Sequence, residues 1–103
     1  MIKVSILYPN ERGSRFDRDY YLNRHIPMVR KRLGSSLKGI SVDFGLDGKD
    51  PGSRPPFLAM GHLLFDSLDD FEAAFGANLE TFKKDVPNYT DIEPTVQISE
   101  VKL

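Results

Sequence analysis

The two halves of the chain repeat one order of patterns, and this repeat limits the fold more than any other feature. Each half has an apolar strand pattern, a serine with an aspartate three residues later, an amphipathic helical pattern and a second strand pattern. The order β-α-β-β-α-β predicts an α+β fold of the ferredoxin-like type. In this fold, a four-stranded antiparallel sheet carries both helices on one face.

Apolar alternation predicts the positions of the four strands. Segments 2–8 and 40–46 have an apolar residue at every second position, which is typical of half-buried strands. Residues 57–65 are apolar on both parities except for His62, as expected of a strand covered on both faces. In the last strand, 95–103, the apolar parity shifts, which predicts either a bulge near residues 99–100 or a tail covered on both faces.

Capping residues and breakers predict where the two helices begin and end. Ser14 fits the start of the first helix, which Gly34 closes. Ser67 fits the start of the second helix, which ends before Val86. Gly76 weakens the middle of this second helix, so two short helices are an alternative. Apolar residues recur at helical spacing from Leu68 onward, and four of them are expected in the core: Phe71, Phe75, Leu79 and Phe82.

Length, charge and cysteine usage exclude several classes of protein. A chain of 103 residues predicts one domain over 1–103. A net charge of −1 gives no general attraction to nucleic acid or to an anionic membrane, and no segment has membrane-spanning length. The absence of cysteine removes disulfides and thiolate chemistry. Without a signal-peptide pattern, we expect a cytoplasmic protein.

The strand pattern also predicts a partner. With both helices on one face of the sheet, the opposite face has no cover within the chain. The strand 57–65 nevertheless has apolar residues on both parities, so something is expected to pack there. For a chain of this size, the simplest occupant is a second copy, and we therefore expect a homodimer. Higher oligomers are not decided by the sequence.

The first helix carries a histidine on its apolar side. With Phe16 at zero and 100° per residue, His25 falls in the middle of an apolar arc from about 120° to 280°. Pro27 lies nearly opposite, where water most easily covers a missing donor. The arc contains Met28, Tyr21, His25, Val29, Leu22, Leu33 and Ile26. This helix is predicted to direct an imidazole inward.

Two interpretations of His25 remain open at this point. One is a neutral core histidine held by a single backbone or tyrosine partner. The other is a general acid or base inside a cleft, since its ordinary pKa lies near neutrality. Tyr21, four residues earlier, would neighbour His25 directly. Asp17 would complete an Asp–Tyr–His relay only if the first turn bends inward.

Five further residues are candidates for ligand binding. They lie at strand ends, helix edges or a strand face: Tyr8, Phe16, Tyr20, Met28 and His62. Tyrosines at such rims bind ligand oxygens, although most are simply amphipathic border residues. His62 faces either the cleft or a dimer interface. The chain has only two histidines and no His-x-x-x-His or Glu-x-x-His spacing, so no metal site is expected. It has no glycine-rich phosphate loop either, and we expect no cofactor.

The first helix resembles the signature of EthD-type proteins in the motif Phe16-Asp17-x-Asp19-Tyr20-Tyr21-x3-His25-x-Pro27-Met28. Phe65-Asp66-Ser67-Leu68 is similar to the opening of their second helix. The resemblance covers essentially the whole chain in element order. It implies a dimeric α/β barrel, in which two sheets face each other and the helices lie outside. The wider superfamily, which includes polyketide cyclases, muconolactone isomerases and cofactor-free monooxygenases, binds apolar or aromatic molecules between sheet and helices.

The residues and the resemblance together leave three functional hypotheses. In the first, the protein binds a small apolar or aromatic molecule, and His25 acts as general acid or base while Tyr21 positions the substrate. Cyclisation, isomerisation, lyase chemistry and cofactor-free oxidation would each fit this site. In the second, the protein is a non-catalytic accessory or metabolite-binding dimer of an oxidative degradation system. In the third, it is a purely structural dimer. Substrate and reaction are not decided by the sequence.

Overall fold

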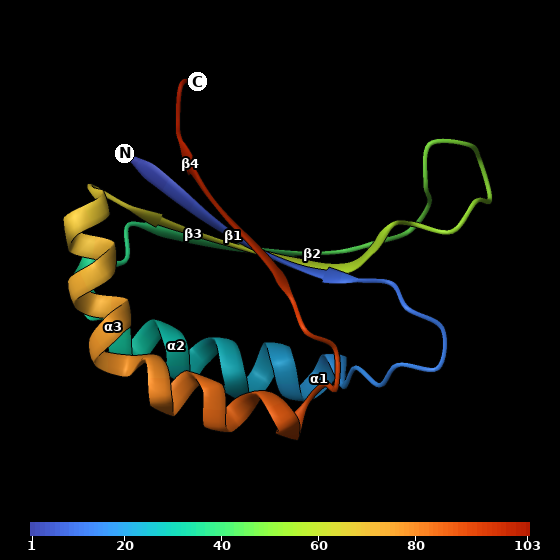
Figure 1. Cartoon of the computed structure of the whole chain (residues 1–103), viewed down its shortest axis with the longest axis horizontal. Helices are drawn as coiled ribbons and strands as arrows, with labels where there is room; N and C mark the ends of the chain where they lie inside the picture. The colour runs from blue at the N-terminus through green and yellow to red at the C-terminus, as the bar shows by residue number, and fades with distance from the viewer.

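A four-stranded antiparallel sheet forms one layer of the molecule and the helices form the other (Figure 1). The computed structural model describes residues 1–103. The strands lie in the order β2-β3-β1-β4. Their bounds are β1 Ile2–Pro9, β2 Gly39–Phe44, β3 Phe57–Phe65 and β4 Thr95–Glu100. The two central strands, β1 and β3, come from different halves of the chain, as the ferredoxin-like order predicts.

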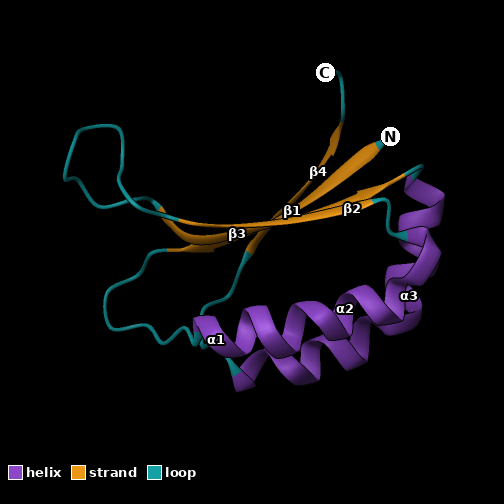
Figure 2. Cartoon of the chain, turned by 180° about the vertical axis from the view of Figure 1, so that it is seen from behind, coloured by secondary structure: helices purple, strands orange, loops and turns teal.

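The helices all lie on one face of this sheet, as the view from behind also shows (Figure 2). The first half contributes α1 Arg18–Tyr20, a π-helical turn Tyr21–His25, α2 Ile26–Leu33 and a 3₁₀ turn Gly34–Ser36. The second half contributes α3 Leu68–Asp85 and a 3₁₀ turn Val86–Asn88. The predicted α+β, ferredoxin-like fold is confirmed.

The π-helical turn is the local feature that places His25. The amide of Ile26 donates to the carbonyl of Tyr21, five residues earlier, instead of four. Pro27, which has no amide hydrogen, follows within the first turn of α2, where no donor is needed. Tyr21 and His25 both point inward and are only 2% and 7% exposed. A π-turn inside a helix often marks a functional site.

The wider turn also explains two differences from the predictions for the first helix. Leu22, expected in the buried arc, is 41% exposed because the π-turn changes the angle between successive side chains. The cap is Asp17, whose carboxylate accepts from the amide of Tyr20, so the prediction of Ser14 as the cap is wrong. Since Asp17 caps the helix end, it does not reach His25, and an Asp17–Tyr21–His25 relay is absent.

Two hydrophobic clusters share the space between sheet and helices. The first cluster is mainly aliphatic and includes two phenylalanines: Val4, Val29, Leu33, Leu63, Phe65 and Phe82. The other is aromatic and contains Tyr8, Tyr21, Ala59, Tyr89 and Ile92. Tyr89 enters this second cluster from the segment that follows α3. Phe16 contacts the same segment through an isolated antiparallel β-bridge to Thr90. The tyrosines are therefore core residues with polar ends.

The second half differs from the predictions in its details. α3 is one helix of 18 residues that bends along its length, not two short helices (Figure 1). A Cβ at Gly76 would meet no atom within 4 Å, so this glycine is not required by packing. β4 pairs with β1 in unbroken register and ends at Glu100, so the predicted bulge near residues 99–100 is wrong. A register shift occurs instead between Tyr8 and Pro9.

The face of the sheet away from the helices has no cover within the chain. The half-buried side chains of Leu7, Met60 and Leu64 lie on it, since their strand neighbours face the helices. The connection 45–56 extends beyond the sheet and curls toward this open face (Figure 1). Its Leu46 is 88% exposed. No helix of the protein combines the length and apolar character needed to cross a membrane.

Candidate functional site

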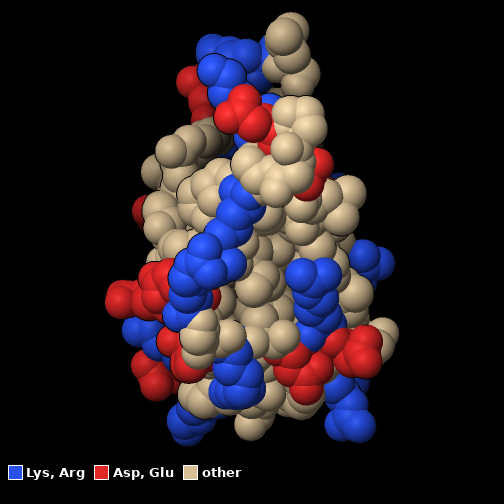
Figure 3. Space-filling model, turned by 90° about the vertical axis from the view of Figure 1, so that its right-hand side faces the viewer, with Lys and Arg blue, Asp and Glu red and all other residues tan.

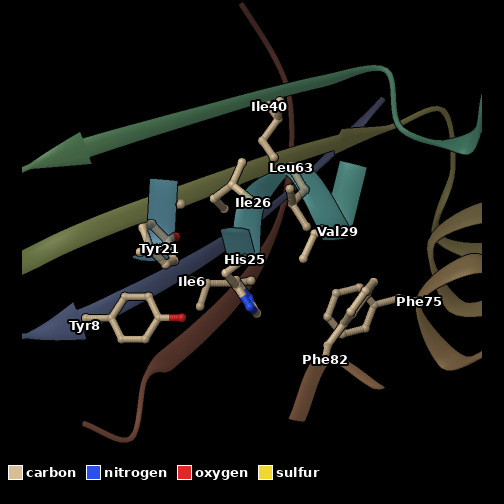
Figure 4. Close-up of a pocket in the computed structure, with 11 residues that line it drawn as sticks. Ile6, Tyr8, Tyr21, His25, Ile26, Val29, Ile40, Leu63, Phe75 and Phe82 are labelled. Atoms are coloured by element: carbon tan, nitrogen blue, oxygen red, sulfur yellow. The ribbon is translucent and has the colours of Figure 1, made fainter. Parts of the chain in front are cut away.

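A small cavity lies between the sheet and the helices, where the two hydrophobic clusters meet (Figure 4). The volume of this cavity is about 40 Å³. Nine of its 11 lining residues are hydrophobic: Ile6, Tyr8, Tyr21, His25, Ile26, Val29, Ile40, Gly61, Leu63, Phe75 and Phe82. This volume has room for about two or three water molecules. A ring-sized ligand would have to move side chains, because a cavity that takes up benzene measures about 150 Å³.

His25 contacts a carboxylate that comes from the other half of the chain. Its Nδ1 lies 2.8 Å from Oδ2 of Asp85, the last residue of α3. Burial lowers the pKa of His25 below 6.5, and the hydrogen bond and charge of Asp85 oppose this shift without reversing it. His25 is therefore neutral near pH 7. An ionised carboxylate only accepts, so the ring proton lies on Nδ1 and Nε2 is free to accept.

Three donors hold the Asp85 carboxylate in place. Besides His25, the hydroxyl of Tyr20 donates to Oδ1 over 2.6 Å and the amide of Asn88 donates over 3.1 Å. Burial alone would raise the pKa of Asp85, but these three hydrogen bonds together lower it below 3.8. The hydrogen bond from Tyr20 to this carboxylate in turn raises the pKa of Tyr20. Asp85 is therefore a fixed anion at the surface end of the site, where its side chain is 19% exposed.

On the side of the His25 ring away from Asp85, Tyr89 contacts Nε2 and Tyr8 contacts Tyr89. The hydroxyl of Tyr89 lies 3.4 Å from Nε2 of His25, and it lies 2.7 Å from the hydroxyl of Tyr8. Tyr89 is fully buried, and its ring centroid is 4.5 Å from that of His25. Burial is the largest influence on both phenols, and it raises the pKa of Tyr89 and that of Tyr8. Both phenols are therefore protonated at neutral pH.

Tyr21 contributes a further hydroxyl to the site. Its ring stacks on His25 at 5.8 Å between centroids and 15° between planes. Burial raises the pKa of Tyr21, and its oxygen takes no part in the hydrogen bonds that join Asp85, His25, Tyr89 and Tyr8. This oxygen lies over Gly61, where a Cβ would come within 2.7 Å of it. Gly61 thus makes the room that the Tyr21 hydroxyl occupies.

Charged side chains are confined to the outside of the molecule. No Lys, Arg, Asp or Glu lines the cavity, and Asp85 reaches it only through His25. On the outer surface the two signs are interspersed, as one face shows (Figure 3). Nowhere do three His, Cys, Asp or Glu side chains gather in a group that could hold a metal ion. The arrangement suits proton transfer to or from an uncharged molecule.

The structure brings together only some of the residues predicted for the site. Tyr8, Tyr21 and His25 line the cavity. Phe16 packs its ring against Tyr8 and Tyr21 behind the cavity wall. Tyr20 acts on His25 indirectly, through Asp85.

Met28 and His62 lie elsewhere. Met28 packs against the aliphatic cluster and does not line the cavity. His62 pairs across the strands with Ser5, and its Nδ1 lies 2.9 Å from the Ser5 hydroxyl. Its neighbours Gly61 and Leu63 face the helices, so His62 points to the open face of the sheet. The cleft alternative for His62 is wrong, and the interface alternative stays a prediction.

Sequence reasoning missed Asp85 and Tyr89. Neither belongs to a motif, because both depend on how the end of α3 meets the first helix. One signal was available for Asp85. A carboxylate in the last turn of a helix faces the negative end of the helix dipole, so it needs a compensating partner. Tyr89 gave no such signal, since a tyrosine after a helix is ordinary.

Comparison with known proteins identifies the family. The model of the EthD domain matches residues 14–93, which include both the π-turn and the end of α3. The chain belongs to the EthD family. No curated protein matches the sequence significantly.

Solved structures show the same fold. An EthD-like protein from Ralstonia eutropha JMP134 is 45% identical, with a TM-score of 0.95 over 99% of this chain and 92% of its own. An ethyl tert-butyl ether D (EthD) family protein from Bacillus halodurans C-125 is 21% identical, with a TM-score of 0.69 over 99% of both chains. A dimeric protein of ferredoxin-like fold from Bacteroides fragilis NCTC 9343 is 15% identical, with a TM-score of 0.62 over 97% of this chain and 95% of its own. The latter two are similar in fold alone.

Proposed function

We propose that this EthD protein binds a small, uncharged, largely apolar organic molecule in the cavity at His25 and carries out proton transfer on it. The observation that carries the proposal is the pairing of a buried neutral histidine with Asp85 beside an apolar cavity. Because burial lowers the pKa of His25, the ring is neutral and can accept a proton there. Asp85 would stabilise the imidazolium that forms.

The composition of the cavity supports the uncharged ligand. An anionic group entering it would meet no cation, and burying an unpaired charge is costly. Polar groups gather on Tyr8, Tyr21 and His25, while Val29, Phe75 and other apolar side chains form the rest of the wall. This division suits a molecule with an oxygen function at one end and an apolar body. The reaction types that fit are cyclisation, isomerisation, lyase chemistry and oxidation without a cofactor.

The proposal includes a homodimer that closes the open face of the sheet. Leu7, Met60 and Leu64 supply apolar surface on that face, and a second copy is the simplest cover. The dimeric neighbour from Bacteroides fragilis shares the fold. The cavity lies on the helix side of the sheet, so a dimer would leave the access of a ligand from the helix side unchanged. A single domain over 1–103 and a cytoplasmic location stay predictions.

A thermal-shift screen followed by turnover assays tests the proposal. Small phenols, lactones and ethers are screened against the wild type, since a ligand of the native state raises its melting temperature. Compounds that stabilise the protein are then assayed with wild type and His25→Ala. We expect His25→Ala to give a folded dimer without turnover.

Each other outcome supports a different hypothesis. Unchanged turnover in His25→Ala would remove the catalytic role of His25. Altered binding with no reaction in either protein would favour the accessory or metabolite-binding dimer. A variant that fails to fold, together with a screen in which nothing stabilises the wild type, would favour the structural dimer.

A further inference from the structure

A series of hydrogen bonds runs from Asp85 through His25 and Tyr89 to Tyr8. Only one assignment of donors and acceptors is consistent along this series. Asp85 is ionised and accepts, so Nδ1 of His25 donates. The neutral ring then has a lone pair on Nε2, and the hydroxyl of Tyr89 donates to it. The oxygen of Tyr89 is thereby left to accept from the hydroxyl of Tyr8, 2.7 Å away. One anion at the surface thus fixes the orientation of every proton in the chain.

This orientation decides what the cavity presents to a ligand. Tyr8 directs its proton toward Tyr89, and its oxygen retains lone pairs on the cavity side. In the close-up, the Tyr8 hydroxyl points toward the His25 ring (Figure 4). Tyr21 lines the cavity and its hydroxyl stays outside this series of hydrogen bonds, so it is available as a donor to a ligand. The Nε2 of His25 is occupied by Tyr89 and is not open to the ligand.

We propose that Tyr8, Tyr89 and His25 form a proton relay backed by Asp85, in which the Tyr8 oxygen receives the proton of a ligand hydroxyl while Tyr21 donates to the same hydroxyl. The proposal rests on the proposed function, because it specifies how His25 acts as a base there. It assigns Tyr8 as the group that contacts the reacting atom. It names the substrate class as an alcohol, phenol or enol.

The step balances without a charged tyrosine. As the ligand O–H bond breaks, its proton bonds to the Tyr8 oxygen and the Tyr8 proton passes to the Tyr89 oxygen. The Tyr89 proton passes to Nε2 of His25. The products are a ligand oxyanion and an imidazolium beside the Asp85 carboxylate, and each tyrosine again carries one proton. Because burial raises the pKa of both phenols, a concerted transfer avoids the tyrosinates that these sites disfavour.

The unligated protein tests the direction of the relay. NMR of the His25 ring and of the tyrosine hydroxyl protons is recorded for wild type, Tyr89→Phe and Tyr8→Phe above the pKa of His25. We expect a slowly exchanging Tyr89 hydroxyl proton in contact with the ring, which disappears in Tyr89→Phe. We expect it to persist in Tyr8→Phe, because this variant leaves the Tyr89–His25 contact intact. A neutral ring that carries its proton on Nε2 would overturn the relay, since Tyr89 would then accept.

Turnover of a substrate found in the screen tests whether the relay is used in catalysis. The same assay distinguishes failure of the relay from failure of the proposed function. We expect Tyr8→Phe to lower kcat about 100-fold or more, the ordinary size of a general acid–base contribution. If Tyr8→Phe stays within a few-fold of wild type while His25→Ala is inactive, the relay is wrong and His25 acts directly. If His25→Ala is itself fully active, the proposed function fails. A screen without a substrate leaves the decision to the NMR result.

Discussion

The carboxylate of Asp85 and the Nδ1 of His25 lie 2.8 Å apart, although 60 residues separate them in the sequence. The contact joins the last residue of α3 to the last residue of the π-helical turn. It also gives the ring a defined tautomer, with Nε2 directed at Tyr89. A proline-adjacent turn and the end of a second helix therefore combine to orient one imidazole. Because Asp85 holds the proton on Nδ1, Nε2 of His25 can accept a proton, and the buried histidine is a candidate base.

Protein stability should fall at acidic pH because of His25. The folded protein holds the pKa of His25 below its unfolded value of 6.5, so the unfolded chain binds its proton first as the pH falls. The free energy of unfolding should therefore decrease from about pH 6.5 downward, by at most about 1.4 kcal/mol per pH unit for this one proton. Denaturant unfolding at fixed protein concentration measures it. His25→Gln should remove this part of the pH dependence, and an identical pH profile in the variant would contradict the assignment.

Gly61→Ala should disturb Tyr21 specifically. The added Cβ would lie 2.7 Å from the Tyr21 hydroxyl, so the ring or the strand has to move. We expect a loss of stability of about 1–3 kcal/mol, the usual cost of overpacking. The double variant Gly61→Ala with Tyr21→Phe should recover part of this loss, because the clashing oxygen is gone. Denaturant unfolding of the four proteins gives the coupling energy. Strict additivity would show that the two residues do not meet.

Met60→Lys should weaken self-association. Met60 lies on the open face of the sheet, and a lysine there would put a charge into the proposed interface. We expect a concentration-dependent shift from dimer to monomer in analytical ultracentrifugation. Leu22→Lys is the control, because Leu22 is exposed on the helix side. If both variants remain as dimeric as the wild type, the dimer does not use this face.

The fold was predictable because its determinants are local and repeated. Alternating apolar residues specify the strands, and the strand Phe57–Phe65 has the predicted bounds. The position of Pro27 opposite the apolar arc did not predict a π-turn. The hydrogen-bond shift at Ile26 depends on how the whole helix packs. For this reason the helical angles placed His25 and Tyr21 correctly inside and Leu22 incorrectly.

The site was only half predictable because its partners are distant in sequence. Tyr21 and His25 share one helix face, so spacing alone joins them. Asp85 and Tyr89 reach His25 through tertiary packing of the other half of the chain. Strand parity left two faces open for His62, and the position of its neighbours Gly61 and Leu63 at the cavity decides between them. Local patterns thus locate a site, while its chemistry depends on contacts between halves.

The most direct test of the central claim is an NMR titration of His25 in wild type and Asp85→Asn. Glu80→Gln is the control, since it removes the same charge from an exposed position of α3. The contact with Asp85 raises the pKa of His25 against the larger effect of burial. We predict a wild-type pKa below 6.5, a still lower pKa in Asp85→Asn, and no change in Glu80→Gln. A His25 pKa at or above 6.5 in the wild type, or one that Asp85→Asn leaves unchanged, would contradict the account.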